Sequence, residues 1–317
     1  MTLTERLRDV AVKPVRQDLR ECVPCKEKML AAMKADAPTA SIVIASRDEG
    51  ERLIRTVESV QATLPGAEIV VVDDGSVVPV VPMSGVTLLR HETPQGCSLS
   101  RHAGLAASTG RVVFILDAHM LFRPGDLDRM ARYAAEHAAI VYACPEGYFG
   151  ATLKQWNGLI FCKWDGVPGG YVQTTGMMGA CYVAQRAVWD RLGGWLVLPR
   201  QYGLDEEAMS LLAAKHNIPI ICATMFHVEH HFRSVGETPY PPDPNGYFVN
   251  LATLYRLLFE DAAYQAFKPA LRRFGCGDDA FAVAESPAWM EYGTRLRGTC
   301  PKSDLDLFLS FLPEALT

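Results

Sequence analysis

The sequence predicts an α/β fold with a mostly parallel central sheet covered by helices. Three observations lead to this prediction. Short apolar runs rich in β-branched residues alternate with amphipathic, helix-like segments from residue 41 to about residue 138. The runs are apolar throughout, as in strands that are buried on both faces. Polar residues follow three of these runs directly, as at the carboxyl ends of parallel strands, where α/β proteins bind ligands.

The first half of the chain supplies four predicted strands and three predicted helices. The apolar runs predict strands over residues 41–45, 68–72 and 112–116, and residues 86–90 can form a further strand. Apolar residues at helical spacing predict a helix over residues 51–62. An Ala-rich segment predicts a helix over 97–108, and Pro124-Gly-Asp126 opens another that continues to about residue 138.

The second half is less regular. Glycine and aromatic residues over 145–180 indicate loops and antiparallel strands. The pattern predicts helices over 186–192, 205–215 and 247–267, and a strand over 218–222. Four prolines between Pro239 and Gly246 predict a loop.

Composition and charge indicate a soluble globular enzyme. The 317 residues are 49% hydrophobic and 21% charged, which excludes a disordered or collagen-like chain. No run of 18 apolar residues is present, so we expect no transmembrane helix, and the N-terminal residues do not resemble a secretory signal. The net charge of -5 gives no support to non-specific binding of polyanions.

Nine cysteines without a signal sequence indicate reduced thiols in a cytoplasmic protein. Cys22 and Cys25 have the spacing of zinc ligands, but no second pair follows at the distance of a zinc finger. We therefore interpret them as a thiol pair rather than a zinc site.

Three polar clusters are expected to face one crevice, because open α/β sheets bind ligands outside the carboxyl ends of their strands. They are Ser46 to Glu49, Asp73-Asp74 and Asp117-Ala-His119. Asp117 and His119 are two residues apart, so in an extended segment both side chains point to the same side. A carboxylate and an imidazole that converge in this way suit Mn²⁺ or a related divalent ion.

A third ligand for such an ion is available from His227, His230 and His231. Geometry alone does not choose among them, because a strand, a turn and a helix would each select a different histidine.

Two acidic clusters have both a functional and a structural interpretation. Asp73 or Asp74 can accept a hydrogen bond from a uracil N3 or a ribose hydroxyl, or can simply form the turn that Gly75-Ser76 continues. Asp205-Glu206-Glu207 precedes a predicted helix, where negative charge is stabilising. The same carboxylates can orient or deprotonate an acceptor hydroxyl. The P-loop, GxSxG and GxGxxG motifs are absent from the positions where they would carry chemistry.

Taken together, these segments resemble the polypeptide N-acetylgalactosaminyltransferases, which have the GT-A fold. The resemblance covers roughly residues 40–267 and rests on the order and spacing of several motifs. They are Ser41 to Glu49 with Leu53 to Val60, Val71-Val-Asp-Asp-Gly-Ser76, Gly96-Cys-Ser-Leu-Ser-Arg101, Asp117-Ala-His119, Thr175-Gly-Met-Met-Gly179, Tyr202-Gly-Leu-Asp-Glu-Glu207 and His227-Val-Glu-His-His-Phe-Arg233. One departure is Tyr202-Gly-Leu-Asp, where the family has Trp-Gly-Gly-Glu.

The resemblance implies a metal-dependent enzyme that uses a UDP-sugar. It implies that Asp117, His119 and His230 bind the metal, and that Arg101 and Arg233 add positive charge at the diphosphate. It implies that the loop from Pro239 to Gly246 closes over the donor. The remaining donor-binding residues that it implies are Ser46, Asp48, Glu49, Asp73, Asp74 and Gly179.

The resemblance also implies a mechanism, although alternatives stay open. The polypeptide transferases retain the anomeric configuration without a protein nucleophile, and their acceptor is a protein Ser or Thr hydroxyl. An inverting family 2 enzyme would need a carboxylate base, for which Glu206 beside Asp205 is the candidate. A hydroxymethylated base in phage-type DNA is an alternative acceptor. An inactive nucleotide-binding module is the non-enzymatic alternative.

The expected organisation has three parts. Residues 1–39 form an N-terminal arm, 40–267 the catalytic domain with its halves meeting near residue 120, and 268–317 an extension packed on the core. We expect a cytoplasmic enzyme without a membrane anchor, in a bacterium or a phage-infected host cell.

Overall fold

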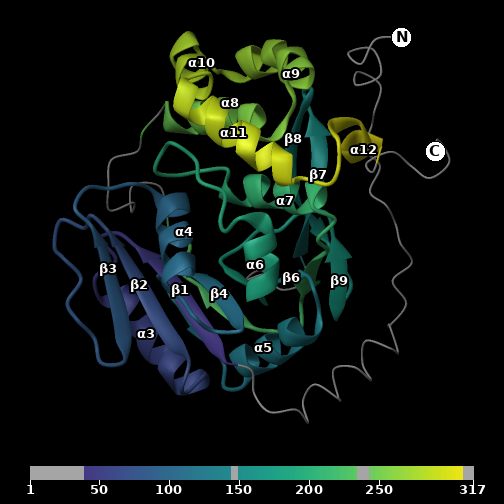
Figure 1. The fold of residues 1–317 in the computed structure, drawn as a ribbon. Helices are drawn as coiled ribbons and strands as arrows, with labels where there is room; N and C mark the ends of the chain where they lie inside the picture. Colours follow the sequence, from purple (N-terminus) through teal and green to yellow (C-terminus); the bar gives the residue numbers. More distant parts are fainter. Residues whose placement is uncertain (1–38, 144–148, 234–242, 244, 310–317) are drawn as a thin grey trace.

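A computed structural model describes residues 39–143, 149–233, 243 and 245–309. Its centre is an eight-stranded sheet with the strand order β3-β2-β1-β4-β10-β6-β11-β9. Helices lie on both faces of this sheet (Figure 1). The predicted N-terminal arm lies outside the described residues except for Thr39, as do Cys22 and Cys25. The division into three parts stays a prediction.

The first half of the sheet is parallel, as the apolar runs predicted. β1 (Ala40–Ser46) pairs with β2 (Glu68–Asp74) on one side and with β4 (Val112–Asp117) on the other, and β3 (Val86–His91) lies at the edge. Burial on both faces explains the continuous apolar pattern. Val43 packs into one core cluster with Leu105 of α4 (Cys97–Ala107), and Ile42 into another with Leu53 of α3 (Glu51–Thr63).

The second half of the sheet is mixed. β10 (Cys181–Gln185) runs antiparallel between β4 and β6 (Ile140–Ala143). β11 (Ile220–Ala223) is parallel to β6, and β9 (Tyr171–Thr174) closes the sheet in the antiparallel sense. The mostly parallel sheet with a smaller antiparallel part is therefore confirmed.

Two small antiparallel ribbons stand outside the main sheet. β7 (Phe149–Trp156) pairs with β8 (Leu159–Gly166) in the region predicted to hold loops and antiparallel strands. β5 (Met120–Phe122) pairs with β12 (Val228–His230), so that His230 lies opposite Met120. This second ribbon brings two segments more than 100 residues apart in sequence to the end of β4.

Helices complete the packing around both parts of the sheet. They are α5 (Asp126–Glu136), α6 (Arg186–Leu192), α7 (Asp205–Lys215), α8 (Gly246–Leu258), α9 (Asp261–Phe274), α10 (Asp278–Ala284), α11 (Pro287–Thr299) and α12 (Asp304–Leu309). Among the described helices, none is both long enough and apolar enough to cross a bilayer.

The single helix predicted over 247–267 is wrong, because α8 and α9 are separate. Phe259 and Glu260 adopt extended backbone angles between them, and the Glu260 amide donates to Asp304 Oδ2 at 2.7 Å. Burial of apolar residues continues on both sides of the break. Apolar periodicity therefore does not reveal it.

Candidate active site and metal centre

The carboxyl ends of three adjacent strands place the polar clusters at one edge of the sheet. Ala45 lies opposite both Val72 and Asp117, and Ser46 lies opposite Asp73. Because these pairs are in register, the residues that follow β1, β2 and β4 all emerge at the same level.

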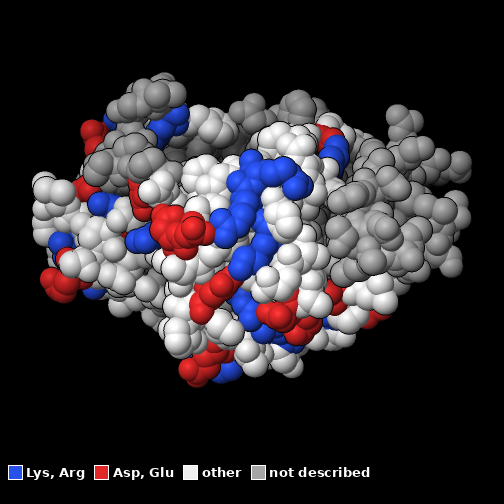
Figure 2. Space-filling view, turned by 90° about the horizontal axis from the view of Figure 1, so that it is seen from above, with Lys and Arg blue, Asp and Glu red and all other residues white. Residues whose placement is uncertain are grey.

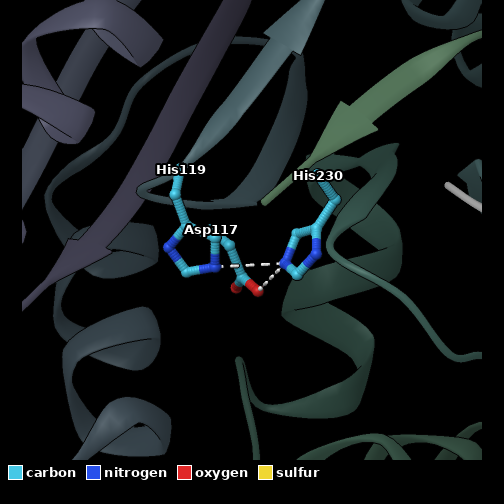
Figure 3. Close-up of side chains that lie close together, drawn as sticks. All are labelled: Asp117, His119 and His230. Atoms are coloured by element: carbon cyan, nitrogen blue, oxygen red, sulfur yellow. Dashed lines mark hydrogen bonds and ion pairs between the residues drawn. The ribbon is translucent and has the colours of Figure 1, made fainter. Parts of the chain in front are cut away.

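Asp117, His119 and His230 converge at this edge (Figure 3). His119 Nε2 lies 3.1 Å from His230 Nε2, and His230 Nε2 lies 3.4 Å from Asp117 Oδ2. The pairing of β5 with β12 carries His230 to this point. The other two histidines of the predicted cluster lie elsewhere: His231 is exposed, and His227 is 41% exposed with its ring 3.6 Å from Glu229.

The three side chains fit a divalent cation. Two imidazole Nε2 atoms that face each other next to a carboxylate form a mixed nitrogen and oxygen donor set, which suits Mn²⁺ and similar ions. His230 Nδ1 is buried and has no hydrogen-bond partner among the described residues. This nitrogen is not the one that faces His119 and Asp117, so the fit to an ion rests on the two Nε2 atoms and the carboxylate.

Arg101 is the counter-ion of Asp117. Its Nη2 donates to Asp117 Oδ1 at 2.7 Å, and its guanidinium lies 4.9 Å from the centre of the Trp195 ring. The Arg101 side chain is only 4% exposed. Burial alone would raise the pKa of Asp117, but Arg101 and then His230 lower this pKa well below its ordinary value. Asp117 is therefore a carboxylate at any physiological pH.

The acidic cluster at the start of α7 has the opposite character. Trp195 Nε1 donates to Asp205 Oδ1 at 3.3 Å, and burial raises the pKa of Asp205 to about 6 despite the nearby charge of Arg101. Burial and the charge of Glu206 raise the pKa of Glu207 to about 7. The Tyr182 hydroxyl lies 2.8 Å from Glu206 Oε1 and also contacts the Gly179 carbonyl, so its single proton is shared between two acceptors. These groups also lie at a helix N-terminus, so the structural interpretation of the cluster holds as well.

Asp73 and Asp74 are engaged by the chain itself. Asp73 accepts from the amides of Ser76 and Val80 and from Arg90, while Asp74 accepts from the amides of Gln95 and Gly96 and contacts His91 Nδ1 at 2.9 Å. Both carboxylates therefore shape the loops that follow β2 and β3. Their predicted contact with the uracil or ribose stays a prediction.

The remaining predicted residues lie around the same edge. Ser46 is buried, and its hydroxyl has no partner among the described residues. The Gly179 carbonyl accepts from Tyr182. Arg233 donates a hydrogen bond to Glu49. Asp48, the residue before Glu49, has a left-handed backbone conformation. The predicted lid from Pro239 to Gly246 lies mostly outside the described residues.

Sequence reasoning missed Trp195, Tyr182 and Asn250. Asn250 is 1% exposed on α8 and accepts from the Arg200 amide at 2.8 Å. Its Nδ2 donates to the carbonyls of Tyr202 and Gly203 at 3.2 and 3.1 Å. It thereby fixes the loop that leads into Asp205. An asparagine among the apolar residues of a predicted helix is a signal for such a role, because a buried amide needs partners.

Comparison with known proteins agrees with this geometry. Residues 41–186 match the model of the family described as glycosyl transferase family 2. This segment, a little less than half of the chain, is therefore similar to family 2 glycosyltransferase domains. It contains the strands β1, β2 and β4. Asp117 is the last residue of β4, and His119 follows it by two residues.

Among curated proteins, the chain is similar to polypeptide N-acetylgalactosaminyltransferases. It is 35% identical to human polypeptide N-acetylgalactosaminyltransferase 15 over 118 residues, which are 33% of this chain and 18% of that protein. It is 26% identical to the type 13 enzyme of Rattus norvegicus over 298 residues, which are 80% of this chain and 52% of that protein. The glycosyltransferase domain is thus homologous to these enzymes, while the chain spans about half the length of the second and less of the first.

A solved structure shares the fold. The crystal structure of GalNAc-T7 with UDP, GalNAc and Mn²⁺ has a TM-score of 0.64 at 19% identity, covering 86% of this chain and 57% of that one. The GT-A fold is therefore confirmed.

Proposed function

We propose that the chain is a metal-dependent glycosyltransferase that moves a hexose or an N-acetylhexosamine from a UDP-sugar to an acceptor hydroxyl. One observation carries this proposal. Asp117, His119 and His230 bring a carboxylate and two imidazoles together at the ligand-binding edge of a domain similar to family 2 glycosyltransferases. The presence of UDP, GalNAc and Mn²⁺ in the GalNAc-T7 structure supports the same donor class and ion.

Asp117, His119 and His230 would hold the cation. When bound, the cation supplies positive charge against the negative charge that develops on the departing UDP. Arg101 contributes a second, permanent positive charge beside Asp117. Its Nε and Nη1 atoms are buried and have no partner among the described residues, so they are donors for an oxygen of the diphosphate or sugar. Because Trp195 holds the guanidinium in place, Arg101 needs little rearrangement to act.

Asp205 and Glu206 are proposed to contact the transferred sugar or the acceptor hydroxyl. Asp205 lies close enough to Arg101 and Asp117 for their charges to influence its pKa. A carboxyl group with a pKa of about 6 can accept a hydrogen bond, or a proton, near neutral pH.

We propose transfer with retention of the anomeric configuration, by similarity to the polypeptide transferases. Retention requires no protein nucleophile. The inverting alternative would use Glu206 as the base that deprotonates the acceptor. The bond from Tyr182 to Glu206 supports a positioning role for this carboxylate, since it already engages one of its oxygens. NMR of the first product formed, before mutarotation, distinguishes the two outcomes.

The proposed acceptor is the hydroxyl of a protein Ser or Thr, as the names of the relatives suggest. A hydroxymethylated DNA base is the alternative. On the face formed by α8 to α11, Figure 2 shows a band of basic side chains flanked by acidic ones. Lys268 pairs with Glu285 at 2.7 Å and Arg272 with Asp278 at 2.8 Å. Because these basic side chains are paired with acidic ones and the net charge is -5, a peptide is favoured over a polyanion such as DNA as the acceptor.

The test is release of UDP from a panel of UDP-sugars with Mn²⁺, in the presence of a Ser/Thr peptide, a glycan or hydroxymethylated DNA. We expect one UDP-sugar to be used, EDTA to abolish release and Mn²⁺ to restore it. His230→Ala should abolish release, whereas the matched control His231→Ala, at an exposed neighbouring position, should leave it intact. Release that continues in EDTA would remove the metal from the mechanism. Binding of UDP without transfer to any acceptor would favour the inactive-module alternative.

A further inference from the structure

Glu49 makes a connection that its place in the sequence does not reveal. Its side chain is only 6% exposed, yet it follows β1 in a turn. Glu49 Oε1 lies 3.2 Å from His119 Nδ1 and also accepts from Arg233 Nη2. The interactions with His119 and Arg233 lower the pKa of Glu49 although burial opposes this change.

The turn that carries Glu49 is held in an unusual conformation. Asp48 has a φ of 53° and Gly50 a φ of 55°, so two of three successive residues are in the left-handed region. The Asp48 amide donates to Ser76 Oγ at 2.9 Å, and Asp48 Oδ1 accepts from the Val77 amide at 2.7 Å. The loop after β2 therefore holds the turn and directs Glu49 inwards. Strained backbone of this kind persists where the surrounding structure stabilises it, commonly at functional sites.

The bond to Glu49 decides which nitrogen of His119 carries the proton. A carboxylate can only accept, so His119 Nδ1 must be the protonated nitrogen. In the neutral ring, the lone pair then resides on Nε2, which is the atom that faces His230 and Asp117. A metal ion binds this lone pair, and a carboxylate on the opposite ring nitrogen is a common way to orient a metal-binding histidine.

The same carboxylate also reaches the segment that contains the third ligand. Arg233 lies three residues after His230, beyond the end of β12. By accepting from both His119 and Arg233, Glu49 links the segment after β4 to the segment after β12. Removal of Glu49 would release both at once.

We propose that Glu49 is a positioning residue that sets the tautomer of His119 and ties together the two histidine-bearing segments of the metal centre. This inference rests on the proposed function for the identity of the site. In this proposal Glu49 acts on the ion through His119, and its predicted role in donor binding stays a prediction.

The test compares Glu49→Ala and Glu49→Gln with Glu51→Gln. Glu51 is a suitable control because it lies two residues away and its side chain is 76% exposed. The first measurement is the ¹⁵N NMR spectrum of the histidine rings in metal-free protein, with His119 assigned by His119→Gln. We expect the Nδ1–H tautomer of His119 in the wild type and in Glu51→Gln. A mixture, or the Nε2–H tautomer, is expected in Glu49→Ala, whereas Glu49→Gln keeps an amide oxygen that can accept from Nδ1–H and is expected to retain more of the original form.

The second measurement is Mn²⁺ affinity by EPR titration without nucleotide. We expect both Glu49 variants to bind Mn²⁺ about 10- to 100-fold more weakly, with melting temperatures that show a folded protein. An unchanged tautomer in Glu49→Ala, or the Nε2–H form already in the wild type, would overturn the proposal. So would unchanged Mn²⁺ affinity. The ¹⁵N spectrum of the histidine rings needs neither metal nor donor. It therefore tests the role of Glu49 even if the wild-type protein transfers no sugar. If Glu49→Ala does not fold, Glu49→Leu provides the same readout, because leucine fills the space of the side chain without an acceptor.

Discussion

The carboxyl groups after β1, β2 and β4 and those at the start of α7 have pKa values that are shifted in opposite directions. The first side of the crevice is formed by β1, β2 and β4. Its carboxylates, Glu49, Asp73 and Asp117, accept hydrogen bonds from arginine, histidine or backbone amides. These bonds lower the pKa of each carboxyl group although burial opposes the change. On the side formed by α7, burial raises the pKa of Asp205 to about 6 and that of Glu207 to about 7. The first side is thus built to keep negative charge, as a cation site requires. The second keeps groups that gain or lose a proton near neutral pH.

Under the proposed function, this difference separates metal binding from recognition of the sugar or acceptor. A carboxylate that binds a cation is best held ionised by a fixed partner such as Arg101. Recognition of a sugar or acceptor hydroxyl benefits from a carboxyl group whose protonation is easily changed. The predictions below test the difference in order of expected effect.

Removal of Asp117 should have the largest effect on stability. Asp117→Ala leaves Arg101 buried beside Trp195 without its ion-pair partner, and an uncompensated buried charge costs about 3 kcal/mol or more. The matched control is Asp128→Ala, which breaks a partly exposed pair with Arg132 and should cost about 0.5 kcal/mol. Urea unfolding at pH 7 measures both. Similar losses for the two variants would mean that Asp205 or water compensates Arg101, and the proposed separation of the two sides would weaken.

Glu207 should make the protein less stable as the pH rises. A carboxyl group with a raised pKa binds its proton more tightly in the folded state, so between about pH 4.5 and 7 folding is favoured at the lower pH. Over this window Glu207 is expected to remove about 1–3 kcal/mol of stability, and Glu207→Gln should abolish that loss. The lowered pKa values of Glu49, Asp73 and Asp117 act in the other direction, and their contribution is lost as the pH falls below about 4.

The measurement is urea unfolding of the wild type and Glu207→Gln at pH 5 and pH 8. We use Glu229→Gln as the control, because Glu229 is 62% exposed. An identical pH dependence in the wild type and Glu207→Gln would show that Glu207 titrates normally.

Loss of the Asn250 side chain should have the smallest effect on stability but should act on the α7 side selectively. Asn250→Ala leaves the backbone groups of Arg200, Tyr202 and Gly203 without their partner, at a cost of about 1–3 kcal/mol that water entry reduces. Because the released loop leads into Asp205, we expect KM for the UDP-sugar or the acceptor to rise while Mn²⁺ affinity stays unchanged. Equal weakening of Mn²⁺ binding would show that the two sides are not independent.

The sequence predicted the first side of the crevice better than the second for a physical reason. Strands β1, β2 and β4 are buried on both faces, so their apolar runs stand out, and the residues that follow them must lie at one edge. The position of β10 between β4 and β6 depends on long-range pairing that no local pattern encodes. The same holds for the ribbon of β5 and β12, which selects His230 from its neighbours.

Contacts between side chains of distant segments were also beyond local reasoning. The resemblance implied donor binding for Glu49, and no local pattern indicated its contacts with His119 and Arg233, 70 and 184 residues further along the chain. The break between α8 and α9 was missed because apolar side chains continue across it. Asp73 and Asp74 show that a carboxylate at a strand end can serve the loop beside it.

Pulsed EPR of Mn²⁺ bound to the protein tests the central claim most directly, because it detects the nitrogen nuclei that coordinate the ion. With the two imidazoles of His119 and His230 as ligands, the wild type should show two coordinated histidine nitrogens, His230→Ala should show one, and His231→Ala should still show two. Wild-type Mn²⁺ without histidine coordination, or an unchanged spectrum in His230→Ala, would contradict the assignment of the metal centre and the function built on it.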